Sequence, residues 1–169
     1  FFMGQVYTRG GDKGSTSLGD GSRVSKGCRR IAVNGAIDET MSILGLARSF
    51  ATGAVAESIK KIQSEFINVM GRVSKAVPDA KISSTAEIEA EIERIRVIVP
   101  MPNVFVLPGD TPCGAGLHMA RSTIRRAERE AVALAQEEDF DPQLLAYLNR
   151  MADLFFAMAL WADYEGKKR

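Results

Sequence analysis

The sequence is short of the residues that build metal sites and disulfide frameworks. It has two cysteines, Cys28 and Cys113, and one histidine, His118. Two cysteines in unrelated contexts form no CxxC pair and no disulfide framework, so a reducing compartment fits the chain better than a secreted one. A single histidine without a cysteine pair argues against a zinc site of the usual kind.

The chain also lacks an excess of charge of one sign and a long apolar run. Lys and Arg number 22 and Asp and Glu number 21, which leaves a net charge of +1. This balance gives no general attraction to nucleic acid or membrane, so any anion must be bound by a local cluster. No apolar run approaches the ~20 residues of a membrane span, and no signal peptide is visible. We therefore expect a cytoplasmic protein that binds neither nucleic acid nor membrane.

Apolar residues recur at helical spacing over most of the chain. The spacing predicts helices over residues 30–51, 55–76, 85–99 and 142–164, and another that begins near residue 114. No internal repeat interrupts this pattern. The expected fold is all-α, an up-and-down five-helix bundle over residues 30–165 that follows an extended glycine-rich N-terminal arm over residues 1–29. We expect residues 1–169 to form a single domain.

The predicted helix that begins near residue 114 has two stripes. Its apolar stripe consists of Leu117, Ala120, Ile124, Ala127, Ala131 and Leu134. A polar stripe lies about 100° further round the helix, at the edge of the core. Its members are His118, Arg121, Arg125 and Glu128. Arginines that only solubilise a helix usually lie opposite the core, whereas this stripe is placed to reach a groove against another helix or another subunit. The alternative is a solvated charged face.

The N-terminal arm is rich in glycine and in hydroxyl side chains, and it carries Arg9, Lys13, Arg23 and Lys26. Glycines let backbone N–H groups turn inward and hydroxyls add donors, so such a loop is able to hold an anion. Neither the Walker pattern GxxxxGK[ST] nor GxGxxG is present. The same composition also fits a flexible tail.

Two further features have open interpretations. Residues 103–107 form a short apolar run between prolines, which either fills the core or lines a pocket for a large flat apolar ligand. Asp38 lies at the edge of the first predicted helix, where it is either an exposed carboxylate or the partner of an arginine on another helix.

Four segments resemble, in the same order, the motifs of the PduO-type ATP:cob(I)alamin adenosyltransferases. They are YTRGGDKGSTSLGDGSRVSK (7–26), NGAIDE (34–39), FVLPGDTPCGAGLHMARSTIRRAERE (105–130) and LNRMADLFF (148–156). The resemblance implies a homotrimer of five-helix bundles with ATP bound at each subunit interface. It implies that cob(I)alamin, or a related corrinoid, attacks the 5′ carbon of ATP to give adenosylcobalamin and triphosphate. Mg²⁺ is implied beside ATP, and the implied partners are a cob(II)alamin reductase and an adenosylcobalamin-dependent enzyme.

The resemblance also implies roles for individual residues. The implied ATP-binding set is Thr8, Arg9, Gly10, Gly11, Asp12, Gly14, Ser15, Thr16, Lys26, Arg121, Arg125, Glu128 and Asn149. Glu128 is the implied ligand of Mg²⁺. The residues implied in catalysis are Arg121, Asp38, Arg125 and Phe105, with Asp38 paired to Arg121 across the subunit interface. The implied corrinoid-binding residues are Phe105, Val106, Leu107 and Pro108, with Phe105 packed beneath the corrin ring, where it displaces the lower axial ligand of cobalt.

Four positions depart from the family pattern. Asp110 stands where a glycine is usual, Asn34 where a tyrosine is common, Thr40 where a leucine is common, and Leu160 where an arginine is frequent. Asp110 places a carboxylate beside the implied corrinoid-binding residues. Two alternatives therefore stay open: a non-catalytic corrinoid-binding or delivery protein of the same fold, and a nucleotide-binding regulator.

Overall fold

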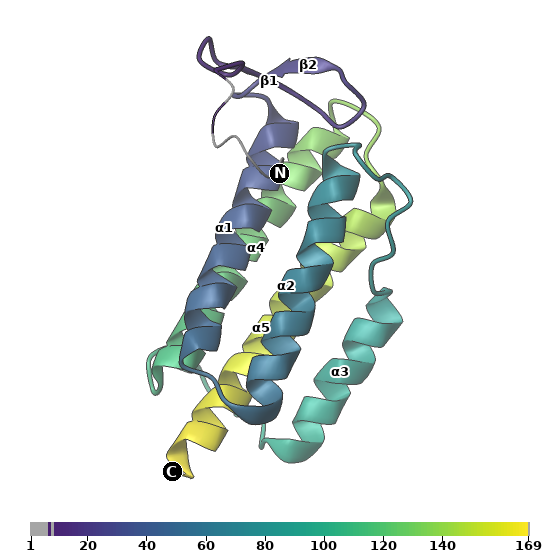
Figure 1. The fold of residues 1–169 in the computed structure, drawn as a ribbon. Coiled ribbons are helices and arrows are strands. Elements are labelled where there is room, and N and C mark those ends of the chain that lie inside the picture. The colour runs from purple at the N-terminus through teal and green to yellow at the C-terminus, as the bar shows by residue number, and fades with distance from the viewer. Residues whose placement is uncertain (1–6, 8, 169) are drawn as a thin grey trace.

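The structure, a computed structural model, describes residue 7 and residues 9–168. Within these residues five helices run up and down in a bundle (Figure 1). They are α1 (Arg29–Ser49), α2 (Gly53–Val73), α3 (Thr85–Ile98), α4 (Pro112–Ala135) and α5 (Pro142–Lys167). The expected five-helix bundle is confirmed. The arm, in contrast, contains an antiparallel hairpin of β1 (Ser15–Ser17) and β2 (Arg23–Ser25), which the sequence pattern did not predict.

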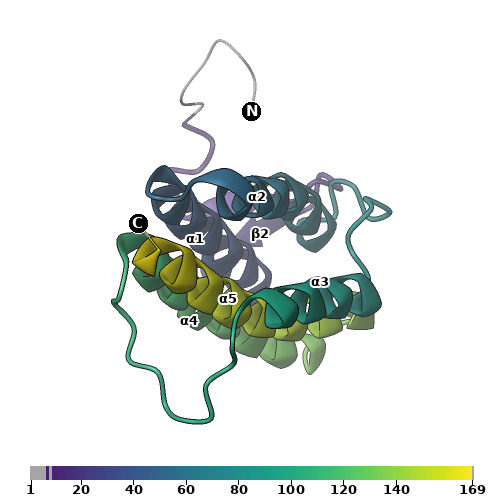
Figure 2. The same ribbon diagram turned by 90° about the horizontal axis from the view of Figure 1, so that it is seen from below.

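The helices pack as a central group with two flanking members. Helix α4 packs against both α1 and α5, α2 lies chiefly against α1, and α3 packs against α5. Figure 2 shows α2 and α3 on different sides of the bundle, and within the described chain they make no close backbone contact. The apolar stripe predicted for α4 is fully buried. Phe66 of α2 contacts Tyr147 and Phe155 of α5 edge-on, with ring centroids 6.4 and 6.2 Å apart.

The helix ends differ from the predicted ends for local reasons. Helix α2 ends at Val73 rather than Ala76, because Lys75 adopts a φ of 61° and the chain turns there. Helix α4 begins at Pro112, because the Thr111 hydroxyl accepts the Gly114 N–H at 2.9 Å and caps the helix. The Thr111 side chain therefore satisfies one of the free backbone N–H groups at the start of α4.

Helix α5 is the most apolar helix of the bundle. It is long enough to cross a membrane, and an 18-residue window within it has a mean hydropathy of 1.2. A helix of this length and hydropathy was not predicted from the sequence. However, 67% of that window is buried inside the bundle. Burial among the other helices accounts for the composition of α5, which is that of a core helix.

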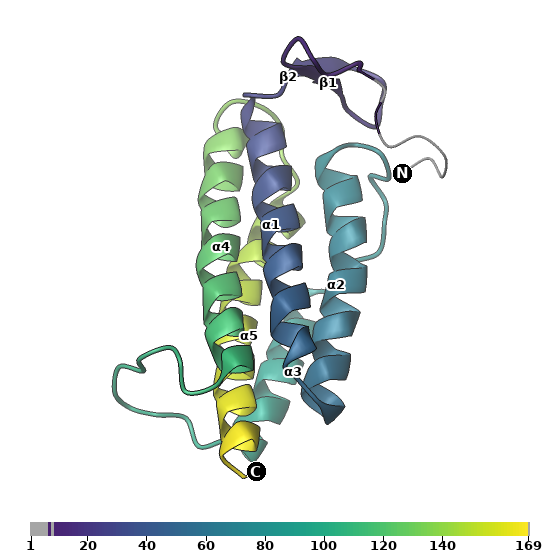
Figure 3. The same cartoon turned by 60° about the vertical axis from the view of Figure 1, so that its left-hand side comes forward.

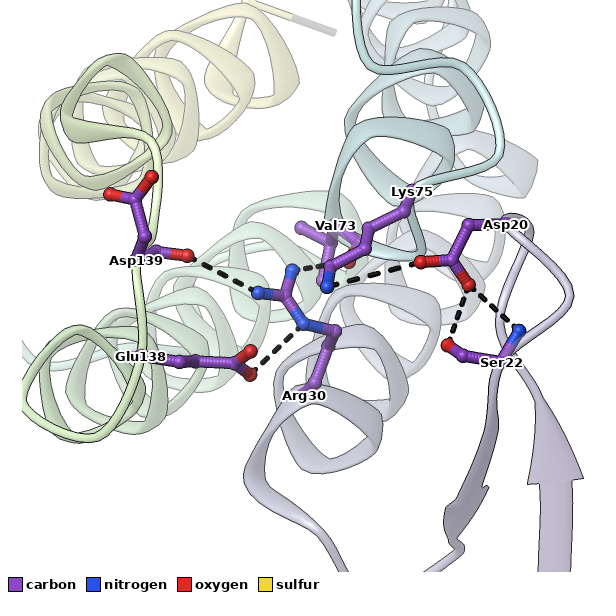
Figure 4. Close-up of polar contacts among 7 residues, drawn as sticks. All are labelled: Asp20, Ser22, Arg30, Val73, Lys75, Glu138 and Asp139. Atoms are coloured by element: carbon purple, nitrogen blue, oxygen red, sulfur yellow. Dashed lines mark hydrogen bonds and ion pairs between the residues drawn. The ribbon is translucent and has the colours of Figure 1, made fainter.

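Arg30 joins three segments at the end of the bundle where α1 begins. Its side chain is buried, and Figure 4 shows it between the end of α2 and the α4–α5 connection. Its Nη1 donates to the carbonyl oxygen of Val73 at 2.8 Å, and its Nε donates to Glu138 Oε1 at 3.1 Å. The guanidinium also lies over the Phe140 ring, 5.7 Å from its centroid. This one cation therefore ties α1 to two other segments.

The hairpin of the arm docks beside Arg30. The Gly19 N–H donates to the carbonyl oxygen of Ser74 at 2.7 Å, and Asp20 pairs with Lys75 at 3.9 Å (Figure 4). A Cβ at Gly19 would lie 2.1 Å from Cα of Ala76, so only glycine permits this approach. The described part of the arm is thus attached to the end of α2, above the end of the bundle (Figure 3).

Candidate functional site

A groove of about 530 Å³ follows the polar edge of α4. We call it the α4–α5 groove. Its lining consists of Ile92, Met101, Arg121, Arg125, Glu128, Asn149, Ala152, Asp153, Phe156 and Ala157. Four residues singled out from the sequence, Arg121, Arg125, Glu128 and Asn149, therefore meet in one place. Asp153 and Phe156 were not assigned a role, although their spacing from Asn149 puts all three on one face of α5.

The α4–α5 groove has an excess of unpaired positive charge. In the described chain neither Arg121 nor Arg125 forms an ion pair, and Nε of Arg121 is buried without a hydrogen-bond partner. The Glu128 carboxylate accepts a hydrogen bond from Asn149 Nδ2 at 2.7 Å, and Asp153 pairs with Arg150 at 2.7 Å. Two arginines without carboxylate partners on one edge form a site that favours an anionic ligand.

The groove continues along α4 into a second hollow. This hollow has a volume of about 310 Å³, shares Arg125 and Glu128 with the groove, and adds Arg129 and Val132. The cationic edge thus extends over more than two turns of α4, which suits a ligand with several charged groups in a row.

His118 does not belong to this polar edge, which corrects the expected stripe. It is only 4% exposed, and its ring packs edge-on against Phe156 with centroids 5.9 Å apart. Burial lowers the pKa of His118, and the nearby charge of Arg121 lowers it further. The imidazole is therefore neutral at neutral pH and lies behind the wall of the groove.

The arm forms a compact loop of its own. Arg23 Nη2 donates to the carbonyl oxygen of Gly10 at 3.0 Å and also to the Ser15 hydroxyl. A Cβ at Gly11 would lie 2.7 Å from Nζ of Lys26, so glycine allows the ammonium to approach the loop. The predicted residues gathered in this loop and its hairpin are Arg9, Gly10, Gly11, Asp12, Gly14, Ser15, Thr16 and Lys26. Thr8 lies outside the described residues.

The arm and the α4–α5 groove are not brought together within one chain. Among the described residues, those that line the groove all come from positions 92–157 and none from the arm. Asp38 is exposed on α1, and the structure shows no ion pair between it and Arg121 within the described chain. Its neighbour Glu39 instead pairs with Arg126. These two groups of predicted site residues remain apart in the single chain.

Residues 99–111 form the α3–α4 loop, which extends away from the helices (Figures 2 and 3). Phe105 at its tip is fully exposed, Val104 and Leu107 are largely exposed, and Val106 packs partly against the core. Of the two interpretations of the apolar run, core filling is therefore wrong for the tip. Exposed apolar side chains at a loop tip are available to a flat apolar ligand.

Three of the departures from the family pattern have a clear structural setting. Asp110 pairs with Lys167 of α5 at 2.7 Å, and this contact raises the pKa of Lys167. Thr40 is buried, and its hydroxyl lies 2.9 Å from that of Thr123 in a hydrogen bond between α1 and α4. Leu160 is buried in the core. The Asp110 carboxylate therefore has a cationic partner, and the other two changes are part of the packing between helices.

These features define an all-α protein with a cationic groove, a glycine-rich arm and an exposed apolar loop. The chain belongs to the cobalamin adenosyltransferase family, whose model matches residues 6–162. The resemblance noted from the four motifs is confirmed.

Individual relatives agree with this assignment. The chain is 36% identical to the corrinoid adenosyltransferase of Bacillus subtilis over 164 residues, which are 92% of this chain and 84% of the relative. It is 33% identical to the cobalamin adenosyltransferase of Cupriavidus metallidurans, covering 93% of this chain and 87% of the relative. It is also 36% identical to the corrinoid adenosyltransferase PduO of Salmonella typhimurium but spans about half of that protein, 49% of its length.

Solved structures show the same fold. A phenylalanine-to-histidine variant of the PduO-type ATP:corrinoid adenosyltransferase from Lactobacillus reuteri, complexed with cobalamin and ATP, superposes with a TM-score of 0.88. It is 30% identical to this chain, and the match covers 96% of this chain and 93% of that chain. An arginine-to-lysine variant of the same enzyme, complexed with ATP, superposes with a TM-score of 0.86 at 31% identity.

Proposed function

We propose that this chain transfers the 5′-deoxyadenosyl group of ATP to the cobalt of cob(I)alamin or a related corrinoid, forming adenosylcobalamin and triphosphate. The observation that carries the proposal is the pair of unpaired arginines, Arg121 and Arg125, in the α4–α5 groove of a chain from this family. The relatives from Lactobacillus reuteri are complexed with ATP and with cobalamin, which supports both substrates.

The chemistry needs a site that stabilises a leaving polyphosphate. Cobalt(I) supplies an electron pair to C5′, a Co–C bond forms, and the C5′–O bond breaks with its electrons on the departing triphosphate. Negative charge therefore increases on the leaving oxygen in the transition state, where fixed cations contribute most. Arg121 and Arg125 are placed to hold the phosphates, and their guanidinium groups donate in pairs to phosphate oxygens.

Glu128 and Asn149 are the residues proposed to hold Mg²⁺. Mg²⁺ in nucleotide sites is usually bound by one or two carboxylates together with phosphate oxygens and water. One carboxylate beside an amide oxygen fits that donor set, and Asn149 keeps Glu128 in place through its hydrogen bond at 2.7 Å. When bound, Mg²⁺ would neutralise part of the phosphate charge.

The complete site is proposed to require a second copy of the chain. Nine residues of the arm would bind ATP from a neighbouring subunit of a homotrimer: Thr8, Arg9, Gly10, Gly11, Asp12, Gly14, Ser15, Thr16 and Lys26. Asp38 would pair with the neighbour's copy of Arg121. Support comes from the single chain, in which the arm does not reach the groove and exposed Asp38 lacks an ion pair among the described residues. The α3–α4 loop would hold the corrinoid with Phe105, Val106, Leu107 and Pro108. A cytoplasmic site of action, a cob(II)alamin reductase and an adenosylcobalamin-dependent enzyme complete the proposal.

A direct assay tests the proposed function. The protein mixed with ATP, Mg²⁺ and chemically reduced cobalamin is expected to give the absorption spectrum of adenosylcobalamin, a product that light destroys. The control is the same mixture without ATP. A spectrum that stays the same with and without ATP would remove the assignment, and binding of cobalamin without turnover would favour the delivery protein instead.

Phe105→Ala is expected to affect the corrinoid and not the nucleotide. Burying a phenylalanine ring against a ligand contributes about 1.5–3 kcal/mol, so kcat/KM for the corrinoid is expected to fall roughly tenfold or more. KM for ATP and the melting temperature are expected to stay unchanged, because Phe105 is fully exposed in the chain. Val97→Ala, which removes a similarly exposed side chain from α3, is the control. A pure nucleotide-binding regulator would not respond to the loss of Phe105.

A further inference from the structure

The base of the α3–α4 loop is held against the last turns of α5 by three contacts. Thr111 Oγ1 donates to Asp163 Oδ1 at 2.7 Å, and Asp110 pairs with Lys167 at 2.7 Å. Gly166 lies so close to Thr111 that a Cβ there would be 2.5 Å from Thr111 Cγ2. The last residues of the loop are therefore fixed by α5, whereas its tip around Phe105 is exposed.

Asp163 is a buried carboxylate that lies outside the α4–α5 groove. It is only 5% exposed, and a Cβ at Gly114 would lie 2.0 Å from its Oδ1, so the first turn of α4 packs directly on it. The Thr111 hydroxyl accepts the Gly114 N–H at 2.9 Å and donates its own proton to Asp163. Burial raises the pKa of the neighbouring Cys113 thiol to about 11, and the Asp163 charge contributes to this rise. Buried carboxylates are costly unless a specific contact offsets the cost, and here the contact is to the end of the loop.

We propose that Asp163 is a positioning residue for the corrinoid, acting through Thr111 on the α3–α4 loop. This inference rests on the proposed function. Val99, at the other end of the loop, is buried directly after α3, and α3 packs against α5, so both ends of the loop are held relative to α5. Because the exposed side chains at the tip have few protein contacts to order them, the anchored base limits the positions that Phe105 reaches. The loop then loses less conformational entropy when the corrinoid binds than a loop with a free base would lose.

Loss of the contact between Asp163 and Thr111 is expected to change KM for the corrinoid and the spectrum of bound cob(II)alamin, but not KM for ATP. Thr111→Val removes the hydroxyl that joins the loop to Asp163, and it is expected to raise KM for the corrinoid roughly fivefold to tenfold, with KM for ATP unchanged. Asp163→Ala is expected to do the same. Thr111→Ser keeps the hydroxyl and Asp163→Asn keeps an acceptor, so both are expected to remain within about twofold of the original chain. A second readout is the spectrum of bound cob(II)alamin, in which the fraction lacking a lower axial ligand is expected to fall in Thr111→Val.

A matched control separates positioning from a general loss of stability. Ser84→Ala removes the N-cap hydroxyl of α3, which accepts the Glu87 N–H at 3.2 Å, and is expected to lower the melting temperature without changing KM for the corrinoid. If Thr111→Val raises both KM values equally, or leaves the corrinoid parameters and the cob(II)alamin spectrum unchanged, the inference is overturned. Should Asp163→Ala not fold, the two threonine variants and Asp163→Asn decide the question. Absence of product from the unaltered chain would overturn the proposed function and this inference together, whereas normal product with unaffected variants overturns only the inference.

Discussion

Arg121→Ala is expected to lower kcat/KM for ATP by roughly 10- to 150-fold, because the loss of one charge-assisted contact costs about 1.5–3 kcal/mol. Arg121 lines the α4–α5 groove and has no ion pair in the described chain, and in the proposed trimer the neighbour's Asp38 would hold its guanidinium beside the phosphates. The contact strengthens as the triphosphate leaves, so part of the loss is expected in kcat rather than in KM alone. Steady-state kinetics with ATP varied at saturating corrinoid measure both parameters.

The same variant is expected to keep its fold, which makes the kinetic result interpretable. Truncation of Arg121 breaks no ion pair within the described chain, so the helical bundle itself is expected to fold, although the proposed pair with the neighbour's Asp38 would be lost. Arg121→Lys should recover only part of the activity, because lysine keeps the charge but not the planar pair of donors. Arg96→Ala is the control, since Arg96 is an exposed arginine that pairs with Glu93 at 2.8 Å on α3, outside the groove. ATP kinetics in Arg121→Ala that match those of Arg96→Ala would contradict the assignment of Arg121.

Arg30→Ala is expected to lower the free energy of unfolding by about 1.5–3 kcal/mol, the usual cost of losing a hydrogen bond from a charged donor to a buried acceptor. Arg30 is 6% exposed and donates to the carbonyl oxygen of Val73 and to Glu138. Its loss leaves the Val73 carbonyl buried without this donor and opens a cavity beside Phe140. Chemical denaturation monitored by circular dichroism gives the free energy directly.

The control for Arg30 is an arginine in an exposed ion pair. Arg126 pairs with Glu39 across α1 and α4, and both side chains are well exposed. Arg126→Ala is therefore expected to cost less than about 1 kcal/mol. Equal denaturation midpoints for Arg30→Ala and Arg126→Ala would show that the contacts of Arg30 drawn in Figure 4 contribute little to stability.

Hydrophobic periodicity predicted the five helices because each helix buries a stripe with a period near 3.6 residues. It did not predict the hairpin, since β1 and β2 contain three residues each, too few for an alternating pattern to emerge. It also did not predict the burial of Arg30, which depends on acceptors far away in the sequence, at Val73 and Glu138. Long-range pairing of this kind has no local signature.

The site was predictable to the extent that it follows one helix. Arg121, Arg125 and Glu128 share an edge of α4 by spacing alone, whereas Asn149 of α5, which lines the same groove, was expected there only from the family resemblance. His118 has the same spacing but is buried behind Phe156, because an edge position is covered or open depending on the side chain that faces it. The separation of the arm from the α4–α5 groove could not be predicted from the sequence either. It depends on how the arm docks on the end of α2.

Within the described chain the backbone of α3 lies close to that of α5 and of no other helix or strand, and α3 reaches α2 only through side chains, such as Glu91, which hydrogen-bonds to Ser58. It leads directly into the loop that carries Phe105, while the arginines lie on α4, which is clamped between α1 and α5. If the loop holds the corrinoid as proposed, its exposed tip would adapt to the ligand while its base stays fixed to α5, with no shift of the contact between α1 and α4. The proposed corrinoid site would then change shape without moving the arginines proposed to hold ATP.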